Sequence, residues 1–281
     1  MAHFSIFLCI AVAFAGFCAL ALYSGLAVRR YTVHSKKLTA PVRLALITDL
    51  HSTPYGQNQE KLIRAIRTEG PDAVLFAGDI VDDKRPAEPA LSLFEALSKE
   101  FPCYYVCGNH EVYTGRADEI KAAIRARGVT VLEGDCMPAV LNGQHLLIAG
   151  VDDPQVWNIP RHHRYAVPEG WLASFNACAQ QAAQSGAFSL LLSHRPELAD
   201  IYRNSAFSLV LSGHAHGGQV RIPGIINGLF ATGQGVFPKY VGGVYPLGGT
   251  TLIVSRGLCL NMLPRVFNRR ELVMVTLCPE E

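Results

Sequence analysis

Residues 42–51 read Val-Arg-Leu-Ala-Leu-Ile-Thr-Asp-Leu-His, an apolar run that ends in a carboxylate and an imidazole. A short apolar run of this length is typical of a buried strand. The same pattern returns at residues 72–77, 102–107, 187–192 and 207–211, and a polar cluster follows each run. We therefore predict five buried strands whose carboxyl ends carry the chemistry of this chain.

The five clusters supply carboxylates, imidazoles and one amide, which are donors that hold divalent metal ions in proteins. They are Asp49-Leu50-His51, Gly78-Asp79-Ile80-Val81-Asp82, Gly108-Asn109-His110-Glu111, Ser193-His194 and Gly213-His214-Ala215-His216. One such cluster would mean little, because polar residues are common at strand ends. Five of them together favour a hydrolytic site with two metal ions.

Segments with helical spacing separate the early strands, as at Leu62, Ile63 and Ile66. Strands that alternate with helices predict an α/β domain that begins with a parallel sheet, where functional residues lie at the carboxyl ends of strands. The predicted helices cover residues 57–68, 89–99, 117–127 and 168–184. Further strands are predicted at residues 129–132, 139–141, 145–151 and 272–277.

Two dications about 3.5–4 Å apart repel each other, so a dinuclear site needs a bridging carboxylate, and Asp79 is the natural candidate. Asp49, His51 and His216 can complete the coordination of one ion. Asn109, His194 and His214 can complete the other. The ions would lower the pKa of a bound water, which would then attack a phosphorus atom.

His110 directly follows the candidate ligand Asn109, so it is placed to protonate the leaving oxygen or to steady charge on the phosphate. Asp82 or Glu111 could orient His110, or support a ligand imidazole from behind.

The ordered set D-x-H, GDxxD, GNH(E), a later His and GHxH resembles the calcineurin-like metallophosphoesterases over roughly residues 43–257. The resemblance implies a four-layer αββα sandwich with a dinuclear site at one end of its sheets. It assigns Asp49, His51, Asp79 and His216 to the first metal. It assigns Asp79, Asn109, His194 and His214 to the second, and the catalytic role to His110. The donors suit Mn, Fe, Zn or Mg, and we favour Mn.

A closer resemblance concerns the membrane-anchored branch of this family, through the run at residues 213–223 and Ser255-Arg256-Gly257-Leu258. That branch includes a UDP-2,3-diacylglucosamine pyrophosphatase of lipid A synthesis and Tat-exported phosphodiesterases. The chain departs from it in two places. Arg29-Arg30 follows the apolar start rather than preceding it, and Arg269-Arg270-Glu271 stands where relatives often show Pro-Glu.

Residues 4–28 carry no charged side chain, and at about 1.5 Å per helical residue they are long enough to cross a bilayer. We expect residues 1–28 to be a transmembrane signal-anchor, 29–41 a basic juxtamembrane linker, and 42–281 the metallophosphoesterase domain. Ala19-Leu20-Ala21 leaves cleavage of this segment as a secretory signal as an alternative.

The side of the membrane on which the domain lies follows from the charges after the apolar segment. No Asp or Glu precedes Asp49, whereas basic residues follow the apolar segment, so the domain is expected on the cytoplasmic side of a single span. The eight cysteines show no CxxC spacing, which agrees with a reducing compartment.

These features predict a membrane-anchored phosphoesterase that hydrolyses a phosphodiester or pyrophosphate bond. Its partners would be the lipid bilayer and a phosphorylated, lipid-linked substrate, with UDP-2,3-diacylglucosamine as the specific expectation. Two alternatives stay open: a phosphodiesterase or phosphatase of broad specificity, and a non-catalytic metal-binding scaffold. The basic residues are concentrated after the apolar segment rather than spread over a folded face, so no nucleic-acid partner is expected.

Overall fold

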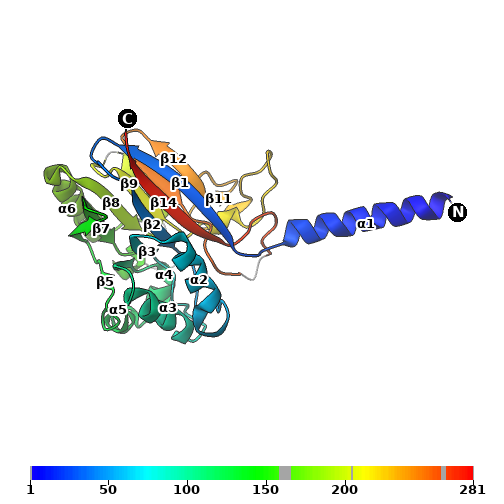
Figure 1. The fold of residues 1–281 in the computed structure, drawn as a ribbon, viewed down its shortest axis with the longest axis horizontal. Coiled ribbons are helices and arrows are strands. Elements are labelled where there is room, and N and C mark those ends of the chain that lie inside the picture. The colour runs from blue at the N-terminus through cyan, green and yellow to red at the C-terminus, as the bar shows by residue number, and fades with distance from the viewer. Residues whose placement is uncertain (1, 158–165, 204, 261–263, 281) are drawn as a thin grey trace.

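The computed structural model describes residues 2–157, 166–203, 205–260 and 264–280. Its body contains two six-stranded sheets (Figure 1). The first has, in order, β1 (Ala27–Ser35), β14 (Glu271–Pro279), β2 (Val42–Ile47), β3 (Ala73–Ala77), β4 (Cys103–Val106) and β5 (Thr130–Val131). The second has β12 (Gly243–Leu247), β13 (Thr250–Val254), β9 (Leu209–Ser212), β8 (Phe188–Ser193), β7 (Gln144–Val151) and β6 (Asp135–Leu141). A small hairpin pairs β10 (Phe230–Ala231) with β11 (Gly235–Val236).

Three apolar cores separate four layers. Leu44, Val275 and Leu190 belong to the core between the two sheets. A second core joins the first sheet to α2 (Glu60–Glu69), α3 (Glu88–Ser98) and α5 (Ala117–Arg125). A third joins the second sheet to α6 (Glu169–Ser185) and α7 (Ala199–Arg203). The αββα sandwich that the resemblance implies is therefore confirmed.

Strand direction places the ligand-bearing loops at one edge. β2, β3, β4 and β5 are parallel to one another, as are β7, β8 and β9. β14 lies between β1 and β2, parallel to β1 and antiparallel to β2: Ala27 of β1 pairs with Glu271, and Val273 pairs with Leu46. The carboxyl ends of β2 to β4 therefore share an edge of the sheet with the start of β1.

The expectation of a linker at residues 29–41 is wrong for most of its length. The segment from Ala27 to Ser35 forms β1, the edge strand next to β14. Its Arg30 is exposed and pairs with Glu69, while Val33 turns inward to the core between the sheets. Edge strands commonly carry charged side chains on their solvent face, so their composition resembles that of a basic linker.

Helix α1 (Ala2–Leu22) leaves the body and makes few contacts with it (Figure 1). Residues 3–22 are the one helix in the described part of the chain that is long and apolar enough to cross a membrane, and only 6% of its most apolar window is buried. The end of the helix is fixed to the domain, because the Phe267 N–H donates to the Ala21 carbonyl at 2.7 Å.

Candidate dinuclear metal centre

The structure brings the seven predicted metal ligands together at one end of the sandwich, where strands of both sheets have their carboxyl ends. Six of these residues are buried and the seventh, His216, is partly exposed. They come from the loops after β2, β3, β8 and β9 and from the start of the short helix α4 (Asn109–Tyr113) that follows β4. The predicted ligands are Asp49, His51, Asp79, Asn109, His194, His214 and His216.

Asp79 lies between two groups of possible ligands. One group contains His51, Asp79 and His110, and the other contains Asp79, His194 and His214. The Oδ2 atom of Asp79 is 3.7 Å from Nε2 of His51 and 3.1 Å from Nε2 of His194. Its Oδ1 atom accepts a hydrogen bond from the backbone N–H of His110 at 2.8 Å. One oxygen is thus held by the protein, and the other faces imidazoles of both groups, as a bridging carboxylate requires.

Asp49 occupies the other side of the centre. Its carboxylate accepts the backbone N–H of His214 at 3.0 Å, which ties the loop after β2 to the loop after β9. Its Oδ1 atom lies 3.8 Å from Nε2 of His216 and 4.0 Å from Nε2 of His194. Burial raises the pKa of Asp49, because the charged form loses its hydration.

Several buried polar atoms have no hydrogen-bond partner within the described part of the chain. A buried polar group without a partner is costly, so such atoms need another explanation. Bound cations would satisfy all of them, and these residues therefore fit the two divalent ions that the motif implies. The atoms are Oδ2 of Asp79, Nε2 of His51 and Oδ1 of Asn109.

The contacts of His194 show that the centre carries an excess of negative charge. Its Nδ1 lies 2.8 Å from the carbonyl oxygen of Ala77 and must donate to it, so a neutral ring turns its Nε2 lone pair toward Asp79. Burial disfavours the imidazolium, but Asp79 outweighs burial and raises the pKa of His194 to about 10. The pocket thus attracts positive charge, which divalent cations would supply.

The ligand loops have strained backbones. Asp49, His51, Asp79, His214 and His216 all have φ between 46° and 65°, in the left-handed region that residues other than glycine rarely adopt. Such conformations cost of order 1 kcal/mol each and concentrate at functional sites. The residue before Asp79 is Gly78, with φ of 83°, and a Cβ there would collide with the ring of His194.

Glu111 holds the strained loops together. Its fully buried carboxylate accepts backbone N–H groups from four residues at 2.7–3.0 Å, namely Asp79, Ile80, Val81 and Gly108. The expectation that Glu111 orients an imidazole is therefore not what the structure shows. The four amides at the loops after β3 and β4 use the carboxylate instead, since those loops leave their N–H groups without strand partners.

Two acidic residues next to the centre, Asp82 and Asp83, each contact a different imidazole. Asp82 accepts from Nδ1 of His51 at 3.1 Å, which leaves Nε2 of His51 for a metal. Partial burial opposes the charge of Asp82, but the hydrogen bond with His51 lowers its pKa to about 2. Asp83 lies 2.7 Å from Nδ1 of His110 and is the acid that orients this ring. The sequence reasoning missed Asp83, although it adjoins Asp82.

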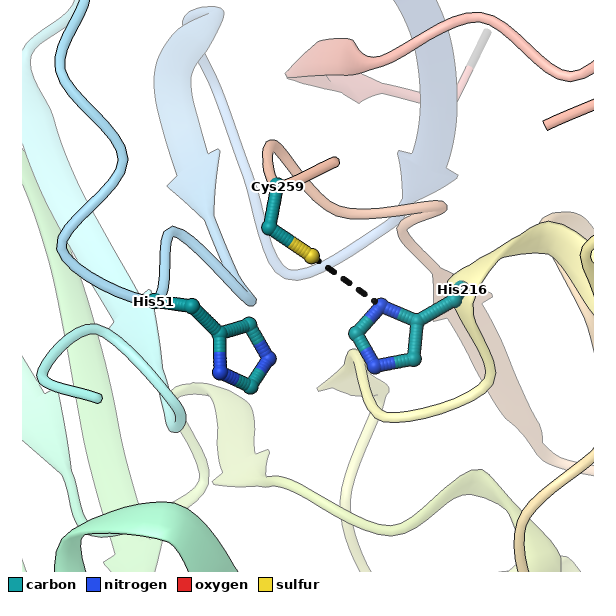
Figure 2. Close-up of side chains that lie close together, drawn as sticks. All are labelled: His51, His216 and Cys259. Carbon is teal, nitrogen blue, oxygen red and sulfur yellow. Dashed lines mark hydrogen bonds between the residues drawn. The ribbon is translucent and has the colours of Figure 1, made fainter. Parts of the chain in front are cut away.

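Two more residues next to the ligands were missed. Oε1 of Glu197 is 3.6 Å from Nε2 of His214, and burial raises the pKa of Glu197 to about 7. Sγ of Cys259 is 3.6 Å from Nδ1 of His216. Figure 2 shows this contact, with the His51 ring beside the pair. His216 therefore turns Nδ1 to sulfur and Nε2 to the metal centre. Glu197 falls three residues after His194, which was the one available signal.

A pocket of about 490 Å³ opens beside the first group of ligands. His51, His110 and His216 form one part of its lining, so a ligand in the pocket can reach the metal centre. Lys84 and Arg85 add positive charge to the wall. The Arg85 guanidinium also donates to the His51 carbonyl at 3.2 Å, so it adjoins the centre directly.

Comparison with known proteins identifies the family. Residues 42–218 match the family described as calcineurin-like phosphoesterase, so the chain belongs to this family. Its members combine the αββα sandwich with a dinuclear divalent metal site, which agrees with the geometry above.

Three similar proteins illustrate the match. An uncharacterized metallophosphoesterase of Campylobacter jejuni is 28% identical over 258 residues, which cover 89% of this chain and 63% of that protein. The phosphodiesterase YaeI of Escherichia coli is 24% identical over 252 residues, 85% of each chain. The crystal structure of a dimetal phosphatase from Danio rerio shares the fold, with a TM-score of 0.51 and 13% identity, over 78% of this chain and 88% of that one.

Replacing Glu111 by glutamine tests its structural role. One oxygen of the carboxylate becomes an NH₂ group that cannot accept the backbone N–H groups, so we expect the E111Q variant to lose about 1–3 kcal/mol of unfolding free energy. Urea denaturation in the presence of a chelator measures this loss apart from metal binding. Glu119→Gln, at an exposed position on α5, is the matched control and should change stability by less than about 0.5 kcal/mol. Equal stability of both variants would contradict the assignment.

Proposed function

We propose that this protein is a membrane-anchored, dinuclear-metal phosphoesterase that hydrolyses a phosphodiester or pyrophosphate bond. The observation that supports it most is the position of Asp79, whose unpartnered Oδ2 faces imidazoles of both ligand groups. The bound ions would supply Lewis acidity and a water of lowered pKa. A non-catalytic scaffold is disfavoured, because this chain retains the complete ligand set together with His110.

His110 is the proposed general acid for the leaving oxygen. It lines the pocket, and its side chain is 29% exposed, so it can reach a bound substrate. Asp83 holds Nδ1, which leaves Nε2 as the atom that would carry the transferred proton. Lys84 and Arg85 lie on the same wall and would balance the charge of a second phosphate or of an anionic headgroup.

Two substitutions separate metal binding from proton transfer. Asp79→Asn removes the bridging charge and should abolish both metal content and the Mn²⁺-stimulated hydrolysis of bis-p-nitrophenyl phosphate. His110→Ala should keep both ions and lose about 10²–10⁴-fold in kcat. Metal content is measured by elemental analysis of the purified full chain.

His145→Ala, at an exposed histidine outside the centre, is the control and should behave as the wild type. Full activity in the His110→Ala variant would refute the acid assignment. Inactivity of the wild type with every divalent metal would favour the scaffold alternative.

The proposed anchor is α1, and the proposed location of the domain is the cytoplasm. The helix is apolar and almost wholly exposed, and the basic residues of β1 follow it. In the described part of the chain the eight cysteines form no disulfide, which fits a reducing compartment. The full chain should fractionate with membranes and resist protease added to intact cells. Digestion of the domain from outside would overturn the orientation.

The specific substrate that we propose is UDP-2,3-diacylglucosamine, cleaved to UMP and a lipid phosphate in lipid A synthesis. The support is the likeness of residues 213–223 and 255–258 to the membrane-anchored branch. A phosphodiesterase of broad specificity is the second candidate, and the name of the YaeI relative favours it.

Mass spectrometry distinguishes the two candidates. The purified full chain in detergent should release UMP from UDP-2,3-diacylglucosamine far faster than from UDP-N-acetylglucosamine, which lacks acyl chains. Similar turnover of the two sugars, together with hydrolysis of simple phosphodiesters, would favour the broad phosphodiesterase.

A further inference from the structure

A group of exposed apolar side chains lies outside the metal centre. Ile225, Val236 and Phe237 are 80%, 62% and 67% exposed, and they belong to residues 220–237, here called the apolar loop. The loop includes the β10–β11 hairpin, and Figure 1 shows β11 on the side of the body from which α1 leaves. Clustered large apolar side chains in water are unfavourable, and they usually mark a partner or membrane surface.

Backbone contacts join the apolar loop to the base of α1. Val220 pairs with Val266 in an isolated bridge, and Arg221 donates its N–H to the Val266 carbonyl at 3.0 Å. The next residue, Phe267, donates to α1 and packs its ring edge-on against Phe17, with 5.5 Å between the ring centroids. The apolar surface therefore continues from the loop to the candidate membrane helix.

Two arginines hold the connection between α1 and β1. Arg269 donates to the carbonyls of Gly25 and Leu26, and Arg270 donates to the carbonyl of Ser24. Because they bind the segment that leaves the helix, α1 has a defined position relative to the loop.

The apolar loop also reaches the metal centre. Phe230, Ala231 and Thr232 line the same pocket as His51 and His216. A molecule whose phosphate lies at the centre would therefore have apolar atoms of the loop beside it. This arrangement suits an amphiphile better than a fully hydrophilic phosphoester.

The charge of this region complements an anionic surface. Residues 201–270 contain no Asp or Glu, and the first 48 residues of the chain also contain none. Anionic lipid headgroups attract such basic segments. The basic residues of 201–270 whose side chains are not buried are Arg203, Arg221, Lys239, Arg256, Arg269 and Arg270.

We propose that the apolar loop docks into the lipid bilayer beside α1 and seats the pocket mouth at the headgroup layer, so that the substrate is an amphiphilic phosphoester taken from the membrane. The sheet topology agrees, because the ends of β2 to β4 that carry the predicted ligands share an edge with Ala27, where the chain enters from α1. This inference rests on the proposed phosphoesterase function and defines where its substrate comes from.

Fluorescence tests the docking without reference to activity. The full-length F237W variant, reconstituted in vesicles of phosphatidylethanolamine and phosphatidylglycerol, should be quenched by brominated phospholipid well beyond the wild type. The control is V140W, because Val140 is 62% exposed but lies on β6, at the opposite edge of the second sheet from β12. It should show no added quenching. Equal quenching of F237W and the wild type would overturn the proposal.

Activity tests the substrate source. The probes are a long-chain alkyl p-nitrophenyl phosphodiester embedded in the same vesicles and soluble bis-p-nitrophenyl phosphate, which share a leaving group. The double variant Ile225→Ser, Phe237→Ser should lose about tenfold or more in kcat/KM on the embedded probe, because it loses apolar contacts with lipid. Its activity on the soluble probe should stay at the wild-type level, and Val140→Ser should leave both activities unchanged.

The two probes also distinguish a failure of the phosphoesterase proposal from a failure of the docking proposal. Hydrolysis of neither probe by the wild type would refute the phosphoesterase function itself. Hydrolysis of the soluble probe, with equal rates for the wild type and the double variant on the embedded one, would refute the docking alone.

Discussion

The metal centre depends on the buried carboxylate of Glu111. It accepts four backbone N–H groups and so fixes the loops after β3 and β4 against each other. The loop after β3 in turn accepts hydrogen bonds from the backbone of Asp49 and His51, through the carbonyls of Gly78 and Asp79. Three loops that carry predicted ligands are thus held, directly or through one another, by a side chain that is not itself a predicted ligand. This network stabilises the left-handed conformations, which the ligand residues would not adopt by themselves.

The second constraint is charge. Two buried aspartates and four imidazoles share a space from which water is largely excluded, so each charged form loses hydration. The structure assigns each imidazole a partner for its other nitrogen: Asp82 for His51, Ala77 for His194, Glu197 for His214 and Cys259 for His216. Each partner turns the remaining nitrogen toward the centre. The remaining nitrogens therefore lie where two divalent cations would need them.

Much of this arrangement could be predicted from the sequence, because it follows from strand ends. Apolar runs that end in Asp49, Asp79 and His194 are visible locally, and parallel strands bring their ends to one edge. What the sequence did not reveal depends on tertiary contacts. β1 has the composition of a basic linker and becomes a strand because β14 inserts beside it. Asp83, Glu197 and Cys259 carry no distinctive spacing, and they matter only because distant loops place histidines next to them.

The insertion of β14 also links the metal centre to the proposed membrane anchor. β1 does not pair with β2 itself, because the last strand, β14, lies between them. Because β14 lies antiparallel to β2 and parallel to β1, the start of β1 comes level with the carboxyl end of β2. The chain that leaves α1 therefore enters the domain at the edge that carries Asp49. If α1 spans a membrane, as we propose, the membrane surface would lie close to the ligand loops and to the basic and apolar segments on that side.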